Sequence, residues 1–218
     1  MPQIFSPKAD GLARLTIWGV AIAVVVALGV TFLLMRSPYA TAVGLVRDQP
    51  VPFSHKHHVG GLGLDCRYCH ASVETSAFAG VPETEVCMTC HSQLWTDADV
   101  LEPVRESWAT GAPIRWQRVN SLPDYAYFDH SVHVAKGVPC EACHGRVDQM
   151  PLTRKAEPLT MSFCVDCHRD PAKRLRPKSA VFAMGWSTKK SRAELGHYLM
   201  KANGIQTETL TDCSTCHR

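Results

Sequence analysis

The residues of this chain that could do chemistry are its cysteines and histidines, which recur together at a fixed spacing. All ten cysteines fall into five Cys-x-x-Cys pairs, and a histidine directly follows each pair. The cysteines are Cys66 and Cys69, Cys87 and Cys90, Cys140 and Cys143, Cys164 and Cys167, and Cys213 and Cys216. The histidines that follow them are His70, His91, His144, His168 and His217. The chain therefore repeats one unit of two thiols and one imidazole five times.

Paired cysteines have two common uses, structural disulfides and zinc binding, and both have to be weighed first. Cysteines this close in sequence rarely form good structural disulfides with each other. A zinc ribbon fits better, because 17 residues separate the first two pairs and 20 residues separate the next two, within the usual zinc spacing. The histidine after every pair decides the interpretation, because Cys-x-x-Cys-His is the attachment signature of c-type haem. The two thiols bind the porphyrin edge and the histidine binds iron, so we expect five covalently bound haem c groups with these five histidines as proximal ligands.

Four further histidines belong to a repeated pattern, Phe-x-His-x-x-His, that precedes the first and third haem motifs. The two copies are Phe53, His55 and His58, and Phe128, His130 and His133. On a helical turn, side chains at i and i+3 point the same general way but stand one turn apart. We therefore expect the four histidines to be distal ligands of two pairs of neighbouring haems. His57 has no counterpart, since Val132 takes its place in the second copy, and we interpret it as a bystander.

The fifth haem lacks a complete module, so its distal ligand stays open. Met184 lies in an apolar stretch, and a thioether is a good axial ligand that raises the reduction potential. His197 is the alternative, although it lies opposite the apolar side of its expected helix. That side runs through Leu195, Tyr198, Leu199 and Ala202. We take Met184 as the predicted ligand and keep His197, Met150, Met161, Met200 or an open site as alternatives.

The N-terminal segment predicts a membrane anchor. Residues 15–35 carry no charge, and their length matches the roughly 20 residues that cross a bilayer. Basic residues lie on both sides of the segment, so the positive-inside rule does not orient it. Bacterial c-type haem is attached outside the cytoplasmic membrane. We therefore expect a single-pass protein of the bacterial cytoplasmic membrane, with its N-terminus inside and its haem domain on the periplasmic side.

The motifs divide the chain and predict its fold class. We expect a mainly α-helical chain with much irregular loop: an N-terminal transmembrane helix and a multihaem cytochrome c domain with little regular secondary structure. The expected parts are a cytoplasmic N-terminus (1–14), the transmembrane helix (15–35), a linker (36–52), a dihaem module (53–91), an inter-module insert (92–127), a second dihaem module (128–168) and a C-terminal segment with the fifth haem (169–218). Periodicity predicts soluble helices at about 97–109 and 190–202.

Charge gives no support for nucleic-acid binding. The polypeptide has a formal net charge of +3, but each haem adds two propionates against one ferric iron. The oxidised protein with five haems would carry about −2. The basic run at residues 169–178 is better interpreted as a solvated face or as partners of haem propionates.

Beyond the individual motifs, the chain resembles a known family. The modules resemble those of the multihaem cytochromes related to cytochromes c3 and c7. The fuller string is similar to the pentahaem subunit of alternative complex III, a bacterial quinol:electron-acceptor oxidoreductase. That string is the anchor followed by "PIRWQRVNSLPDYAYFDHSVHV", "GVPCEACHGRVDQM", "LTMSFCVDCHR" and "DCSTCHR". The resemblance implies partners in a membrane quinol-oxidising complex: an iron–sulfur subunit, a polytopic quinol-binding subunit and a monohaem cytochrome. It places the quinol-oxidising residues, and hence catalysis, outside this chain.

Three functional classes follow from these observations. The first is an electron-transfer subunit that takes electrons from the iron–sulfur subunit towards a periplasmic cytochrome or copper protein. The second is a stand-alone, membrane-anchored quinol dehydrogenase cytochrome. The third is a catalytic multihaem reductase, which needs one haem with a vacant distal position. Because spare ligands suffice for all five haems, the sequence favours the first class.

Overall fold

The computed structural model describes residues 6–217, which fall into two compact units, Met1–Val43 and Gly44–Arg218. Each unit is described by itself. The described residues form helices and irregular loops without any β-strand, and a single bridge joins Val46 to Arg154. The predicted fold class, mainly α with long irregular connections, is therefore confirmed.

The first unit consists of one long apolar helix and a short one. Helix α1 spans Pro7–Arg36, and α2 spans Pro38–Thr41 after a break at Ser37. Helix α1 is long and apolar enough to cross a membrane, because it contains an 18-residue window with a mean hydropathy of 2.6, and the side chains of that window are exposed. An apolar surface on every side is typical of a helix that lies in lipid. The predicted span of 15–35 lies inside this helix.

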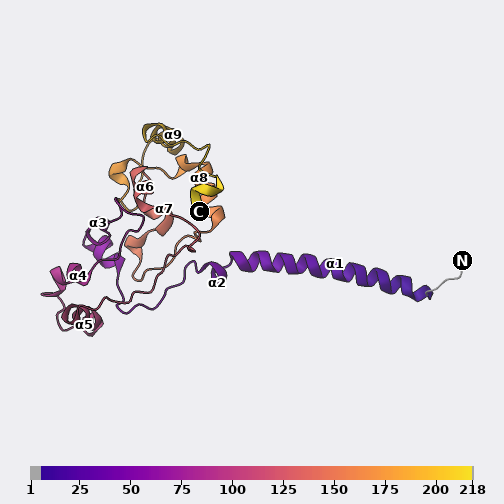
Figure 1. The fold of residues 1–218 in the computed structure, drawn as a ribbon, viewed down its shortest axis with the longest axis horizontal. Coiled ribbons are helices and arrows are strands. Elements are labelled where there is room, and N and C mark those ends of the chain that lie inside the picture. The colour runs from indigo at the N-terminus through magenta and orange to yellow at the C-terminus, as the bar shows by residue number, and fades with distance from the viewer. Residues whose placement is uncertain (1–5, 218) are drawn as a thin grey trace. The chain divides into compact units, whose positions relative to one another are not determined.

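The second unit holds all the cysteines on short helices (Figure 1). Its elements are η1 (Lys56–Gly61, a π-helix), α3 (Cys66–Cys69), α4 (Thr84–His91), η2 (Asp99–Leu101), α5 (Glu102–Thr110), α6 (His130–Ala135), α7 (Glu141–His144), η3 (Val147–Gln149), α8 (Met161–Arg169), η4 (Pro171–Lys173), η5 (Lys178–Ala180), α9 (Arg192–Ala202) and α10 (Cys213–Cys216). Within this unit, α3, α4 and α5 lie at one end, and α6 to α9 lie at the other together with the C-terminus.

The inter-module insert supplies a small apolar core beside the second cysteine motif. Buried Val51, Leu101 and Val104 form its centre, and Cys87 and Met88 of α4 pack against it. Partly buried Ala98, Ile114 and Trp116 complete the cluster. The helix predicted at about 97–109 corresponds to η2 and α5. The insert thus holds α4, and with it the second motif, on a packed apolar base.

The last soluble helix packs through a glycine. Helix α9 corresponds to the helix predicted at about 190–202 and buries Gly196 and Leu199, whereas Tyr198 is 68% exposed. A side chain at position 196 would collide with the backbone carbonyl of Ala172 in η4. The predicted apolar side is therefore correct for Leu199 and for half-buried Leu195, and wrong for Tyr198 and Ala202, which are exposed. The close backbone approach at Gly196 brings the glycine side of the helix onto η4 instead.

Candidate functional site

Each of the five cysteine pairs lies on one short helical turn. Helices α3 and α10 consist of the four residues from the first cysteine to the second, α4 and α8 each carry a whole pair, and α7 carries Cys143 with Cys140 as its N-cap. In α3 the turn begins at Asp65, whose carboxylate accepts a hydrogen bond from the backbone N–H of Arg67 at 2.9 Å. This is an ordinary N-terminal cap. One turn of helix points both thiols to one side and leaves the histidine at its C-terminal end.

Four pairs of imidazoles face each other, and each pair joins a motif histidine to a histidine of the Phe-x-His-x-x-His pattern. The ring centres are 6.5 Å apart for His55 and His70, 6.2 Å for His58 and His91, 6.3 Å for His130 and His144, and 6.1 Å for His133 and His168. In each module, the first histidine of the Phe-x-His-x-x-His pattern lies opposite the histidine of that module's first cysteine motif. The second histidine of the pattern lies opposite the histidine of that module's second cysteine motif. The structure thus brings together eight of the nine histidines that the sequence singled out.

This separation fits two imidazoles on opposite sides of one metal ion. With metal–nitrogen bonds of about 2.0 Å, ring centres lie about 6 Å apart across the metal. Direct van der Waals stacking would bring the rings considerably closer. The donor set, two nitrogens on one axis with two thiols at the side, also suits a covalently bound haem. The residues present therefore fit the group that the sequence predicts.

Nδ1 of each of these histidines already has a polar contact within the protein, which leaves Nε2 as the ligand atom. Among the motif histidines, four Nδ1–H groups donate to backbone carbonyls: His70 to Gly80 at 2.7 Å, His91 to Leu94 at 3.1 Å, His168 to Leu210 at 2.9 Å and His217 to Tyr125 at 3.0 Å. Among the patterned histidines, His58 donates to Ser54, His130 to Ala77 and His133 to Asp129, while His55 lies 2.9 Å from the Thr153 hydroxyl. Such contacts fix the tautomer and orientation of metal-binding histidines.

The remaining motif histidine, His144 of the third motif, contacts a side chain instead of a backbone carbonyl. Its Nδ1 lies 3.2 Å from the amide nitrogen of Asn120, and the Asn120 amide oxygen is buried with no partner among the described residues. With the amide turned by 180°, that oxygen would lie against Nδ1–H of His144 and accept a hydrogen bond from it. Sequence reasoning missed Asn120, because no spacing in the insert points to it.

The phenylalanine of the repeated pattern has a structural role. Phe53 stacks on His58 at 4.4 Å and meets His55 edge-on at 4.9 Å. Phe128 repeats both contacts in the second module, at 4.5 Å with His133 and 4.7 Å with His130. One aromatic ring thus separates and orients the two imidazoles of each module, which explains why the two histidines occur with a phenylalanine.

Burial keeps several of these imidazoles neutral. It lowers the pKa of His144 to about 4, and the nearby His130 adds to the effect. Burial likewise lowers the pKa of His55 to about 4, with a contribution from His70, and it lowers the pKa of His133. A neutral imidazole is the form that binds a metal, so the site is set up for ligation at neutral pH.

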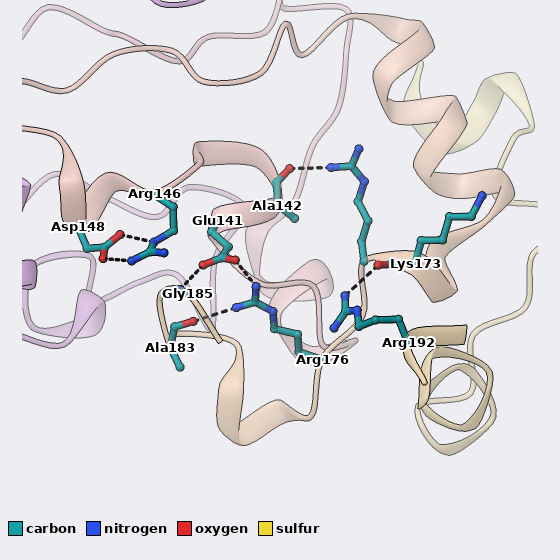
Figure 2. Close-up of polar contacts among 10 residues, drawn as sticks. Glu141, Ala142, Arg146, Asp148, Lys173, Arg176, Ala183, Gly185 and Arg192 are labelled. Carbon is teal, nitrogen blue, oxygen red and sulfur yellow. Dashed lines mark hydrogen bonds and ion pairs between the residues drawn. The ribbon is translucent and has the colours of Figure 1, made fainter. Parts of the chain in front are cut away.

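The remaining candidates lie outside the four pairs. His57 is exposed and contacts the Trp95 ring at 6.2 Å, and His197 is exposed on α9. Met184 is half-buried in a segment that is fixed to α7, the third motif: Arg176 donates to the carbonyl of Ala183, and the N–H of Gly185 donates to Glu141 (Figure 2). The position of the fifth distal ligand is therefore not defined by an imidazole pair.

Comparison with known proteins gives three matches. Residues 126–218 match the family model of cytochrome c7 and related cytochrome c, and residues 35–110 match that of the class III cytochrome c family. The multiheme cytochrome c subunit of menaquinone reductase from Nitratidesulfovibrio vulgaris is 29% identical over 174 residues. That alignment covers 78% of this chain and 68% of the relative. All three are haem proteins, which decides between haem and zinc. The two halves of the second unit are therefore each similar to multihaem c-type cytochromes of the c7 and c3 kind, which supports haem c as the group that the cysteines and histidines bind.

Proposed function

We propose that this chain is a membrane-anchored pentahaem cytochrome that transfers electrons as one subunit of a membrane quinone-linked complex. The observation that supports it is the set of four facing imidazole pairs, each beside its own pair of thiols. A bound haem supplies an iron that accepts and releases one electron. The protein's own residues hold that iron: ten cysteines attach the haem edges, five motif histidines bind from one side, and His55, His58, His130 and His133 bind from the other.

The proposed ligand set favours electron transfer over catalysis. A reductase needs an iron position open to its substrate, but four motifs already face a second imidazole. The fifth motif, with Met184 as its proposed distal ligand and His197 as the alternative, is the one place where an open position could exist. The reductase class therefore ranks below the electron-transfer class.

Membrane attachment rests on α1. The helix is apolar along most of its 30 residues, and a span of that length crosses a bilayer with some tilt. In this proposal the N-terminus lies in the cytoplasm and the second unit lies on the periplasmic side, where c-type haem is attached. Protease treatment of intact spheroplasts should remove the second unit and leave α1 in the membrane.

Two kinds of complex are compatible with the chain. Its motif string resembles the pentahaem subunit of alternative complex III, which implies flow from an iron–sulfur subunit towards a monohaem cytochrome or other periplasmic acceptor. The Nitratidesulfovibrio relative belongs to a menaquinone reductase, whose name describes flow in the opposite sense, towards the quinone. We propose the quinol-oxidising direction and keep the quinone-reducing direction as the second candidate.

The deciding experiment uses the complex as it exists in the membrane. Purification in mild detergent through a tag on this chain, followed by mass spectrometry, identifies the co-purifying subunits. Addition of a short-chain quinol to the oxidised complex should reduce its haems, and a quinol-site inhibitor should prevent this. Haems that stay oxidised with quinol, yet pass electrons from a reduced periplasmic cytochrome to added quinone, would support the second candidate. Reduction of the isolated chain by quinol would instead identify a stand-alone quinol dehydrogenase.

A further inference from the structure

The two dihaem modules hold each other's histidines. His55 of the first module contacts the hydroxyl of Thr153, which belongs to the second module. In return, His130 of the second module donates from Nδ1 to the carbonyl of Ala77 in the first module, at 2.8 Å. These two histidines face the first and third motifs, respectively. The reciprocal contacts bring those two motifs together at the junction between the modules.

Backbone contacts reinforce this junction. The N–H of Lys56 in η1 donates to the carbonyl of Met150, at 3.0 Å. Gly60 approaches the backbone of Asp148 so closely that a side chain at this position would collide with it. The side chains of Cys66 and Cys140, from the first and third motifs, lie close enough to interact, and this interaction lowers the pKa of Cys66 and raises that of Cys140. The first and third motifs are therefore direct neighbours.

Within the first module, the second motif lies next to the first. The phenol of Tyr68, between the two cysteines of α3, hydrogen-bonds to the hydroxyl of Thr89, between the two cysteines of α4, at 2.8 Å. Burial raises the pKa of Cys69, and the nearby Cys87 adds to the rise. The second motif thus adjoins the first, and the apolar cluster of the insert covers its other side.

The third motif leads in the same way to the fourth and then to the fifth. Arg174 donates to the carbonyl of Ala142 in the third motif, and its guanidinium lies 5.0 Å from the centre of the Phe163 ring, next to Cys164 of the fourth motif. His168 of the fourth motif donates to Leu210, just before α10. Burial raises the pKa of Cys164, and nearby Cys216 adds to the rise. The fourth motif therefore lies between the third and the fifth.

Exposure separates the ends of this series from its middle. Cys90 of the second motif and Cys213 of the fifth are exposed, whereas the eight other cysteines are half-buried. A cysteine marks the haem edge that it binds. The second and fifth motifs therefore present the most accessible edges to solvent.

We infer that the five haem motifs form one unbranched row in the order second, first, third, fourth, fifth, and that other proteins exchange electrons with this chain at the second and fifth motifs. The inference rests on the proposed function, because it requires a haem at each motif. It adds the order of the motifs, which the sequence order does not give, and it assigns the two ends.

The test compares five variants, each with both cysteines of one motif replaced by alanine. Neighbouring haems influence each other's reduction potentials by charge, so a redox titration reveals which haems adjoin the one that was lost. Loss of the second or fifth motif should strongly shift one remaining potential, and loss of the first, third or fourth should strongly shift two. Two strong shifts after loss of an end motif, or one after loss of the third, would overturn the order.

Haem content separates this result from a failure of the proposed function. A pyridine haemochrome assay should find five covalently bound haems per chain in the wild-type protein and four in each variant. A wild-type value below five contradicts the proposed function itself, whereas five haems with the wrong pattern of shifts contradict only the order.

A second measurement needs no loss of haem. Ser92, Glu208 and Gln149 are exposed. Each can be replaced by cysteine and labelled with a nitroxide, since the native thiols are bound to haem. Pulsed dipolar spectroscopy of the ferric protein then gives the label–haem distances. The longest distance from position 92 or 208, at the ends, should clearly exceed the longest from position 149, at the central junction. Equal longest distances from all three positions would rule out a row with these ends.

Discussion

Nδ1 of His144 lies 3.2 Å from the side-chain amide of Asn120, whereas the other four motif histidines donate to backbone carbonyls. Asn120 is therefore the one residue whose mutation can change the environment of a single proximal histidine without moving the backbone. A hydrogen-bond acceptor at Nδ1 raises the basicity of a histidine that binds iron through Nε2, and so stabilises the higher oxidation state of the iron.

The substitution Asn120→Leu should raise one reduction potential and shift the low-spin electron paramagnetic resonance signal of one haem. The reason is that His144 loses its hydrogen-bond acceptor and becomes a weaker electron donor to iron. Asn120→Asp, which keeps an oxygen towards the imidazole, should bring the potential back to or below the wild-type value. A redox titration monitored by absorbance measures both effects.

Asn203 provides the matched control for this experiment. Its amide donates to the carbonyl of Lys136 at 3.0 Å, in a contact that involves no histidine. Asn203→Leu should lower stability by about 1 kcal/mol, through the loss of a hydrogen bond, and leave all the potentials in place. Equal shifts in the Asn120 and Asn203 variants would mean that the Asn120 effect is one of general packing.

The four facing imidazole pairs predict which haem each distal histidine serves. His55→Ala should leave one haem high-spin and able to bind carbon monoxide when reduced, because its sixth ligand is gone. Combination with loss of Cys66 and Cys69 should abolish carbon monoxide binding, since the affected haem is then absent. Combination with loss of Cys87 and Cys90 should leave carbon monoxide binding intact. An absorbance titration with carbon monoxide gives the number of haems that bind it in each variant.

His57 is the natural control for this series. It lies two residues from His55, is exposed and contacts Trp95 instead of a motif histidine. His57→Ala should keep the low-spin spectrum and bind no carbon monoxide. Carbon monoxide binding by this variant, together with an unchanged spectrum in His55→Ala, would exchange the roles of the two residues.

The sequence predicted the motifs and the repeat well, because both depend on short-range spacing. The pattern of Phe53, His55 and His58 defines a local turn, and the structure places His55 at the N-cap of η1 and His58 inside this helix. Helix α1 was equally easy to predict from the sequence, because a long uncharged apolar run has few possible structures other than a helix. The predictions of a long apolar N-terminal helix and of the two soluble helices were therefore correct to within a few residues, apart from the longer N-terminal extent of α1.

Contacts between distant segments could not be predicted in the same way. Thr153 and Ala77 hold histidines that lie 98 and 53 residues away in sequence. Nothing in their residue types distinguishes them from other threonines and alanines. The order of the motifs also depends on these long-range contacts. Without them, the chain order from first to fifth would be the natural but different expectation.

The ion pair between Glu141 and Arg176 fixes the segment that carries Met184 onto the third motif. Arg176 is 6% exposed, and its guanidinium also donates to the carbonyl of Ala183 (Figure 2). Glu141→Gln removes the charge partner and leaves Arg176 buried without compensation, which should lower the free energy of unfolding by about 3–5 kcal/mol. Asp148→Asn removes the partner of Arg146, whose side chain is 42% exposed and stays solvated without that partner, so it should cost about 1 kcal/mol or less. Thermal unfolding followed by circular dichroism measures both values, and similar losses in the two variants would contradict the special role of the buried pair.

The last prediction concerns the fifth haem, for which the proposed distal ligand is Met184 and the alternative is His197. A thioether favours ferrous iron relative to imidazole, so a methionine-ligated haem should have the highest potential of the five. Met184→His should then lower that potential and leave the other four nearly unchanged, because the replacement side chain is also an axial ligand.

The matching variant decides between the two residues. His197 is exposed on α9, so His197→Ala should leave every potential and the low-spin spectrum unchanged if Met184 is the ligand. A redox titration of both variants, with carbon monoxide binding as a second measurement, gives opposite patterns for the two assignments. If Met184→His has no effect and His197→Ala opens a position for carbon monoxide, the fifth haem has two histidine ligands. In that case the high potential that would make the fifth motif the point where electrons collect loses its chemical basis. The fifth motif would remain an end of the row by its exposure, but the direction of flow would have to be set by the partners.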